Sequence, residues 1–137
     1  MNFTEASKVA QNLKHAYPGD TFLAISVTPN KNFGWNILDF GGWRVYKLAE
    51  SNGNSISDDQ VKEKALCWMF DSKSITDVEK RKNFIYEKMK NIFPAHKVNV
   101  FLFRESDSIL YYLTNSSKGT AFFEREIYGH ALLVILM

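Results

Sequence analysis

The sequence predicts an α+β fold with a largely antiparallel sheet and helices packed on one side. Two apolar runs joined by Gly41-Gly42 have the form of a β-hairpin, and the last third of the chain consists almost wholly of strand-like segments. Helical segments do not alternate one by one with strands, as they would in a parallel βαβ fold. The expected order is helix, three strands, two helices and four strands.

Length and composition favour a single globular domain over residues 1–137. A chain of 137 residues is long enough to bury about two-thirds of its unfolded surface. Cys67 is the only cysteine, so an intramolecular disulfide is excluded, and its spacing from the three histidines does not resemble a zinc site. We therefore expect no metal and no cofactor.

Both ends of the sequence favour a cytoplasmic protein. The first twenty residues have amphipathic helical spacing and lack the basic and apolar regions of a signal peptide. The closing HALLVILM is apolar, but it is far shorter than the ~20 residues that cross a bilayer. We expect a buried strand there and no membrane role.

The first half begins with an amphipathic helix from Thr4 to about Ala16, in which small and apolar residues recur every three or four positions. Asn2 or Thr4 can serve as its N-cap. The segment from Thr21 to Thr28 is rich in β-branched and aromatic residues and is predicted to be a strand.

The segment from Phe33 to Glu50 is predicted to be a hairpin with Gly41-Gly42 as its two-residue loop. The register then pairs Phe40 with Trp43 and Asp39 with Arg44, followed by Leu38 with Val45, Ile37 with Tyr46, Asn36 with Lys47 and Trp35 with Leu48. Both faces of this hairpin are apolar. Its aromatic residues either belong to the core or form a partner-binding surface, for which the candidates are Asp39, Phe40, Trp43 and Arg44.

Two helices are predicted in the middle of the chain. Ser57 with Gln60 forms a capping box for a helix to about Phe70, and Thr76 with Glu79 forms one for a helix to about Phe93. Cys67 lies late in the first of these helices, where nothing favours a reactive thiolate, so we expect it to be a packing residue.

The second of these helices carries the only basic concentration in the chain. Its residues are candidates for contact with a phosphate or an acidic partner, although such a face is commonly just solvated. The set comprises Lys80, Arg81, Lys82, Lys88, Lys90 and, just beyond the helix, Lys97.

The last third is predicted to form an antiparallel meander. Its four strands are residues 97–104, 108–114, 120–128 and 131–137, with a tight connection or a bend at Gly129-His130.

In the third of these strands, alternation places two carboxylates between two aromatic rings on one face: Phe122, Glu124, Glu126 and Tyr128. Carboxylates are costly to bury, so this face is either a contact surface for a basic partner or an edge whose charges prevent aggregation.

No motif in the sequence brings an acid, a base and a nucleophile together. We therefore expect a small intracellular protein-binding inhibitor or immunity-type protein that blocks a partner protein such as a toxin or nuclease. One alternative is nucleic-acid binding through the Lys80 to Lys97 basic face, although the net charge of only +2 tells against it. The other is a small nuclease-like enzyme that uses His130 or His96 with Glu124 and Lys97.

Overall fold

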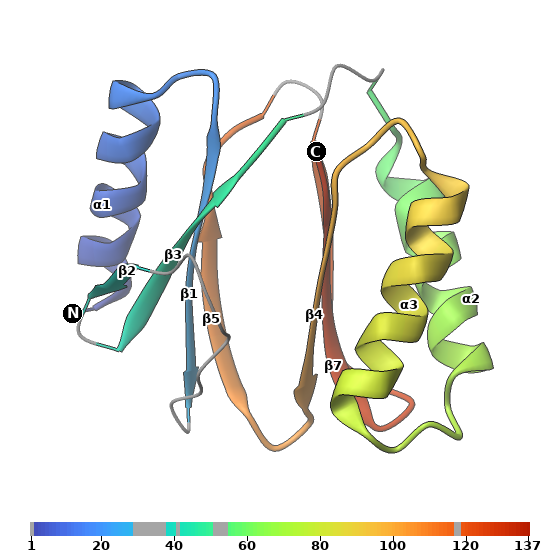
Figure 1. The fold of residues 1–137 in the computed structure, drawn as a ribbon. Coiled ribbons are helices and arrows are strands. Elements are labelled where there is room, and N and C mark those ends of the chain that lie inside the picture. The colour runs from blue at the N-terminus through green and yellow to red at the C-terminus, as the bar shows by residue number, and fades with distance from the viewer. Residues whose placement is uncertain (1, 29–37, 41, 51–54, 117–118) are drawn as a thin grey trace. The chain divides into compact units, whose positions relative to one another are not determined.

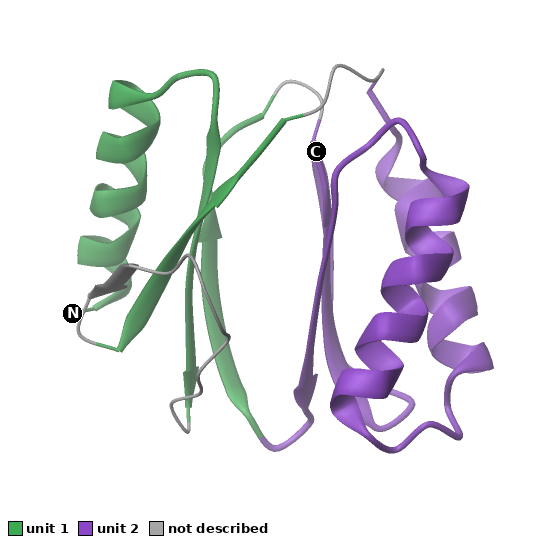
Figure 2. Cartoon of the chain, viewed as in Figure 1, with its two compact units in different colours: residues 1–50, 107–116 green, residues 51–106, 117–137 purple. Residues whose placement is uncertain are grey.

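The computed structural model describes residues 2–28, 38–40, 42–50, 55–116 and 119–137. It confirms the α+β class and the predicted order of helices and strands (Figure 1). The chain forms two compact units, residues 1–50 with 107–116 and residues 51–106 with 117–137 (Figure 2). The expectation of a single domain stays a prediction. Within the described residues, no helix is long and apolar enough to cross a membrane.

Unit 1 is a four-stranded antiparallel sheet with one helix on it. Its strands lie in the order β2-β3-β1-β5. The elements are α1 (Phe3–Ala16), β1 (Thr21–Thr28), β2 (Leu38–Phe40), β3 (Trp43–Leu48) and β5 (Ser108–Leu113).

The core of unit 1 forms where α1 meets the sheet. Asn2 is the N-cap of α1, and its side-chain oxygen accepts a hydrogen bond from the Glu5 backbone N–H at 2.8 Å. Ala6 and Ala10 are fully buried, and their small side chains allow the helix to approach Trp43 closely. Trp43 is only 4% exposed, so it belongs to this core and offers no surface to a partner.

The described part of the predicted hairpin is confirmed. Phe40 lies opposite Trp43, Asp39 opposite Arg44 and Leu38 opposite Val45. Gly42 has a φ of +87°, as its place in a two-residue loop requires. The pairs predicted beyond Leu38, and Gly41 itself, lie outside the described residues.

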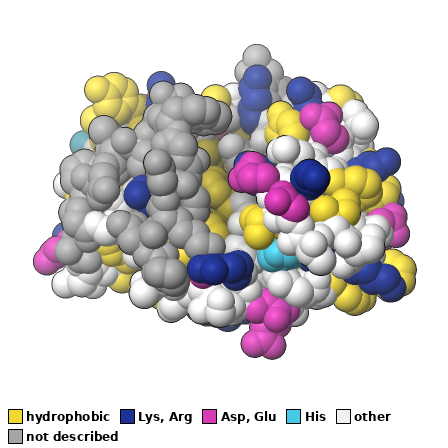
Figure 3. Space-filling model, turned by 60° about the horizontal axis from the view of Figure 1, so that its bottom comes forward, with side chains coloured by type: hydrophobic (Ala, Val, Ile, Leu, Met, Phe, Trp, Pro, Cys, Tyr) yellow, Lys and Arg dark blue, Asp and Glu magenta, His cyan; other side chains and the backbone are white. Residues whose placement is uncertain are grey.

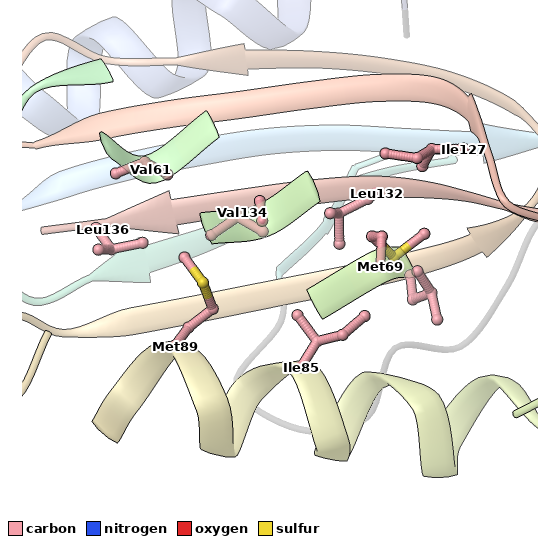
Figure 4. Packing of buried hydrophobic residues seen from close by; sticks show 10 residues of the cluster. Val61, Met69, Ile85, Met89, Ile127, Leu132, Val134 and Leu136 are labelled. Atoms are coloured by element: carbon pink, nitrogen blue, oxygen red, sulfur yellow. The ribbon is translucent and has the colours of Figure 1, made fainter. Parts of the chain in front are cut away.

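Unit 2 is a three-stranded antiparallel sheet, in the order β4-β7-β6, with two helices on one face. Its elements are α2 (Asp58–Asp71), α3 (Val78–Ile92), β4 (Val98–Arg104), β6 (Thr120–Ile127) and β7 (His130–Leu136). Figure 4 shows how Met69 of α2 and Ile85 of α3 point toward Leu132 of β7 in the core. This sheet therefore buries one full face against helices.

The N-caps of α2 and α3 were predicted from local sequence, one correctly and one incorrectly. Ser57 caps α2 as predicted, and its Oγ accepts from the Gln60 N–H at 3.2 Å. The predicted cap at Thr76 is wrong by one position, because the Asp77 carboxylate accepts from the Lys80 N–H at 2.9 Å. Asp and Thr are both good caps, so composition alone did not separate them.

Two predictions for the last third are wrong. It is not a meander, because β5 pairs with β1 in unit 1 whereas β4 and β6 both pair with β7. The alternation along β6 also fails, because a register shift between Glu124 and Ile127 places Ile127 in the same core as Phe122. A β-bulge of this kind moves every later side chain to the other face.

The prediction that Cys67 is a packing residue is also wrong, because Cys67 is exposed. The buried positions of α2 are Val61, Ala65 and Met69, and Cys67 lies off this stripe.

We expect Gly42→Ala to lower the free energy of unfolding by about 1 kcal/mol, because alanine resists positive φ. A Cβ at Gly42 would meet no atom within 4 Å, so the loss of stability would come from backbone conformation alone. The matched control is Gly19→Ala, which also meets no atom and has no positive φ. Equal urea midpoints for the two variants would contradict the assigned turn.

Candidate functional site

Arg81 is the largest buried side chain of the chain's described part and is 1% exposed. It shares one stripe of α3 with Ile85 and Met89, at successive spacings of four residues. The prediction that Arg81 belongs to the exposed basic face is therefore wrong. Its helical position places it in the core although its charge favours solvent.

The guanidinium of Arg81 bonds to two other segments of unit 2, the end of α2 and the β6–β7 turn with the residue that follows it. Nη1 donates to the Tyr128 carbonyl at 2.6 Å, and Nη2 donates to the Met69 carbonyl at 2.7 Å. Nε donates to Ser72 Oγ at 3.0 Å, and Nη1 also lies 2.8 Å from His130 Nδ1. All three guanidinium nitrogens are therefore engaged, as a buried cation requires.

Among the described residues, Arg81 forms no ion pair with a carboxylate. Burial lowers the pKa of Arg81, although an arginine remains protonated at any ordinary pH. The end of α2 offsets part of the cost of burying the Arg81 charge. Met69 lies in the last turn of α2, where carbonyls have no partner within the helix. The last turn of α2 contains no basic residue of its own, so Arg81 supplies that charge from α3.

The contact with His130 fixes the state of that imidazole. A guanidinium can only donate, so His130 Nδ1 must accept, and the ring must be neutral with its proton on Nε2. His130 is 8% exposed and begins β7 directly after the β6–β7 turn. This arrangement of Arg81 and His130 therefore requires an unprotonated histidine.

The β6–β7 turn consists of Tyr128 and Gly129, with φ values of 47° and 95°. Positive φ at both central residues is the requirement of a type I′ hairpin turn. Tyr128 is the one non-glycine residue with positive φ in the described part of the chain. Arg81 holds its carbonyl, and the Glu105 carboxylate accepts from the Gly129 N–H at 3.2 Å.

Two exposed aromatic side chains lie directly outside this buried cluster. Tyr128 is 51% exposed and Phe70 is 48% exposed, yet their rings meet edge to face with centroids 5.5 Å apart. The Lys73 ammonium lies 4.0 Å from the Phe70 ring centroid. Figure 1 shows the end of α2 and the β6–β7 turn at the same end of unit 2. We call Phe70 and Tyr128 the aromatic pair.

The predicted basic face is not a continuous cationic surface. Lys82 forms an ion pair with Glu79 at 2.9 Å, and Lys88 lies 5.6 Å from the Trp68 ring. Lys90 lies 5.7 Å from the Tyr86 ring. Arg81 is buried and Lys82, Lys88 and Lys90 make these contacts. The other two members of the set, Lys80 and Lys97, are exposed.

The other predicted contact residues are divided by the fold. Phe122 packs partly buried against the core of unit 2, Glu124 is exposed just before the bulge, and Glu126 is exposed within it. Arg44 is half-buried in β3. The side chains of Asp39 and Phe40 lie outside the described residues, so the structure brings Tyr128 alone of the predicted set into the aromatic pair.

The form of the predicted nuclease-like site that combines His130 with Lys97 is not assembled, and the form that uses His96 stays a prediction. Lys97 precedes β4 and His130 begins β7, and the antiparallel register of these strands separates the two residues by the length of the sheet, about 20 Å. His96 packs edge to face on Phe93. Among the described residues, no three His, Cys, Asp or Glu side chains are grouped to hold a metal ion.

Sequence reasoning missed Phe70, Ser72 and the role of Arg81. The one available signal was the spacing of Arg81, Ile85 and Met89, which is the spacing of a buried helical stripe. Nothing in the sequence indicated that the acceptors would come from residues 12 and 47 positions away.

Comparison of the chain with protein-family models, with curated proteins and with solved structures found no match. The geometry of the chain itself is therefore what bears on its function.

We expect Arg81→Met to lower the free energy of unfolding by about 3 kcal/mol or more, because it removes the donor to the partly buried Tyr128 carbonyl and one of the two donors to the buried Met69 carbonyl. Arg81→Lys keeps the charge but loses the planar fork, so its stability should also fall well below that of the wild type. Lys80→Met, one position earlier on the exposed side of α3, is the matched control and should change stability little. Urea unfolding curves that coincide for Arg81→Met and Lys80→Met would contradict the proposed importance of the buried cation.

Proposed function

We propose that this protein is a protein-binding module whose contact surface centres on the aromatic pair, Phe70 and Tyr128. An inhibitor or immunity-type protein that occludes a partner such as a toxin or nuclease is the form of this function that we favour. Such a protein needs a stable scaffold and a rigid surface, and no reactive group of its own.

The observation that carries the proposal is the backbone conformation of Tyr128. Glycine or asparagine adopts a φ of 47° with far less strain than tyrosine does. Strain of this kind is characteristic of functional positions, where the side chain has a use that outweighs its conformational cost. At Tyr128 the ring is half exposed, so its contribution to the protein's own core is small.

The aromatic pair also has the physical properties of a binding hot spot. Tyrosine and phenylalanine offer large, rigid contact areas, and aromatic residues are enriched where binding energy is concentrated. The pair is ordered before any partner arrives, because Arg81 hydrogen-bonds the carbonyls of Met69 and Tyr128. Less conformational entropy is then lost on binding.

Charges of both signs surround the aromatic pair. Lys73 lies over the Phe70 ring, and the Glu105 carboxylate is held beside the turn by Gly129. Glu126 and Arg125 are exposed just before the turn. Figure 3 shows hydrophobic side chains interspersed with acidic and basic ones on one face of the molecule. An apolar centre with a charged rim is the usual anatomy of a protein interface.

We expect Tyr128→Asn to keep or raise the stability of the fold and to weaken partner binding about tenfold or more, because asparagine suits positive φ but removes the aromatic anchor. The measurement pairs a thermal melt with covalent capture, in which a photoreactive phenylalanine analogue at position 70 labels the partner in cells. Identified adducts are then remade with purified partner, and their affinity is measured by calorimetry.

The matched control is Tyr17, which is 57% exposed in unit 1. A photoreactive analogue at position 17 should not capture the same protein, and Tyr17→Asn should leave the affinity unchanged. Equal labelling from both positions, or full affinity in a stable Tyr128→Asn variant, would overturn the proposed surface. Capture of RNA or DNA in place of a protein would favour nucleic-acid binding.

A further inference from the structure

The contact between Arg81 and His130 depends on pH in a way that the other contacts of Arg81 do not. Ser72 Oγ and the two carbonyls accept hydrogen bonds at any ordinary pH, whereas a protonated imidazole has no lone pair left with which to accept. Histidine is also the one side chain whose unperturbed titration lies near neutral pH. His130 is therefore the pH-sensitive member of this cluster.

Protonation of His130 would place two cations 2.8 Å apart in a buried site. Repulsion between unit charges at such a distance is strong where water is largely excluded. One of the two side chains must then move. The same Nη1 atom of Arg81 bonds both His130 and the Tyr128 carbonyl, so a movement of this nitrogen is felt directly at the turn.

The charged and titratable groups that the strand register and the hydrogen bonds place near His130 come from three elements. Arg104 of β4 lies opposite His130 in the strand register and adds positive charge. Glu105 is the nearest carboxylate in sequence to that position, and it is exposed and accepts from Gly129. On β6, Ile127 lies opposite His130 and carries no charge, and α2 contributes Ser72 and a carbonyl, which do not titrate. Lys73, which follows α2, lies over the Phe70 ring.

We propose that His130 makes the aromatic pair responsive to pH: protonation of its imidazole causes Arg81 to release the Tyr128 carbonyl, and the rings of Phe70 and Tyr128 separate. The strained backbone of Tyr128 favours this response, because a residue held at positive φ relaxes when its restraint is lost. The proposal rests on the proposed function only for its consequence, which is that acidification releases the partner.

The sign of the effect on stability follows from proton binding. The folded arrangement needs neutral His130, whereas the unfolded chain binds a proton with an ordinary histidine pKa near ~6.5. The unfolded state therefore holds more protons, and this contribution to stability is complete above that pH and falls on acidification.

The experiment is an NMR titration of the isolated protein from about pH 7.5 to about pH 5.0, within the range in which histidines change charge. It follows the ring signals of Tyr128, assigned by their loss in Tyr128→Asn, together with the imidazole signals of His130. We expect the Tyr128 ring to leave the position set by Phe70 as His130 becomes protonated. Hydrogen exchange of the Gly129 amide should accelerate about tenfold relative to its intrinsic rate over the same interval.

The matched variant is His130→Gln, whose amide oxygen accepts from Arg81 and does not titrate. Its Tyr128 signals should stay constant with pH, while those of Tyr17 report any general unfolding in both proteins. The proposal fails if His130 titrates without movement of Tyr128, if His130 remains neutral at about pH 5.0, or if Tyr128 moves equally in His130→Gln. Should the variant not fold, the wild-type titration alone decides.

No partner is present in this titration, so its result is independent of the proposed function. Loss of partner affinity in Tyr128→Asn tests the surface, whereas the coupled movement of His130 and Tyr128 tests the switch. A failure of either leaves the other standing.

Discussion

The burial of one guanidinium constrains the whole of unit 2. Arg81 has been transferred from water into a core of aliphatic side chains, and such a transfer is unfavourable unless the N–H groups of the cation find acceptors. Those acceptors come from the end of α2, the turn between β6 and β7 and the start of β7. Three segments that are distant in sequence, α3, the end of α2 and the β6–β7 turn with the residue that follows it, must therefore meet at one point. Apolar packing makes no directional demand of this kind.

The elements that could be predicted from the sequence are those set by neighbouring residues. Asn2 and Ser57 cap their helices through contacts three residues away, and Gly42 sets the register of the hairpin through its own φ. Both effects act within a few residues, so a local pattern is enough to reveal them. The pairing of β5 with β1 joins residues 80 to 90 positions apart, and hairpin-like spacing gave no indication of it.

The candidate site was less predictable because it depends on two exceptions to local rules. Alternation along β6 predicted Phe122, Glu124, Glu126 and Tyr128 on one face, and the bulge before Ile127 removed that relation. Tyr128 is exposed nonetheless, but because it lies in a turn rather than on a strand face. Arg81 was assigned to the surface by its charge, whereas its helical phase places it in the core. Local rules fail most often at functional or strained positions. Both exceptions involve residues at or next to the hydrogen bond between Arg81 and the Tyr128 carbonyl.

The buried hydrogen bonds of Arg81 determine how precisely the exposed rings of Phe70 and Tyr128 are positioned. An apolar core specifies volume and pattern, and its side chains tolerate small rotations of one helix against another. The Arg81 guanidinium does not tolerate such rotations, because Nη1 and Nη2 each require an acceptor in line with an N–H. A rotation of α3 would lose the bond to Met69, to Tyr128 or to both. Phe70 follows Met69 directly in α2, and the carbonyl that Arg81 holds is that of Tyr128 itself. The separation of the two exposed rings is thus set by a cation that no partner can touch, and that cation remains in place only while His130 is neutral.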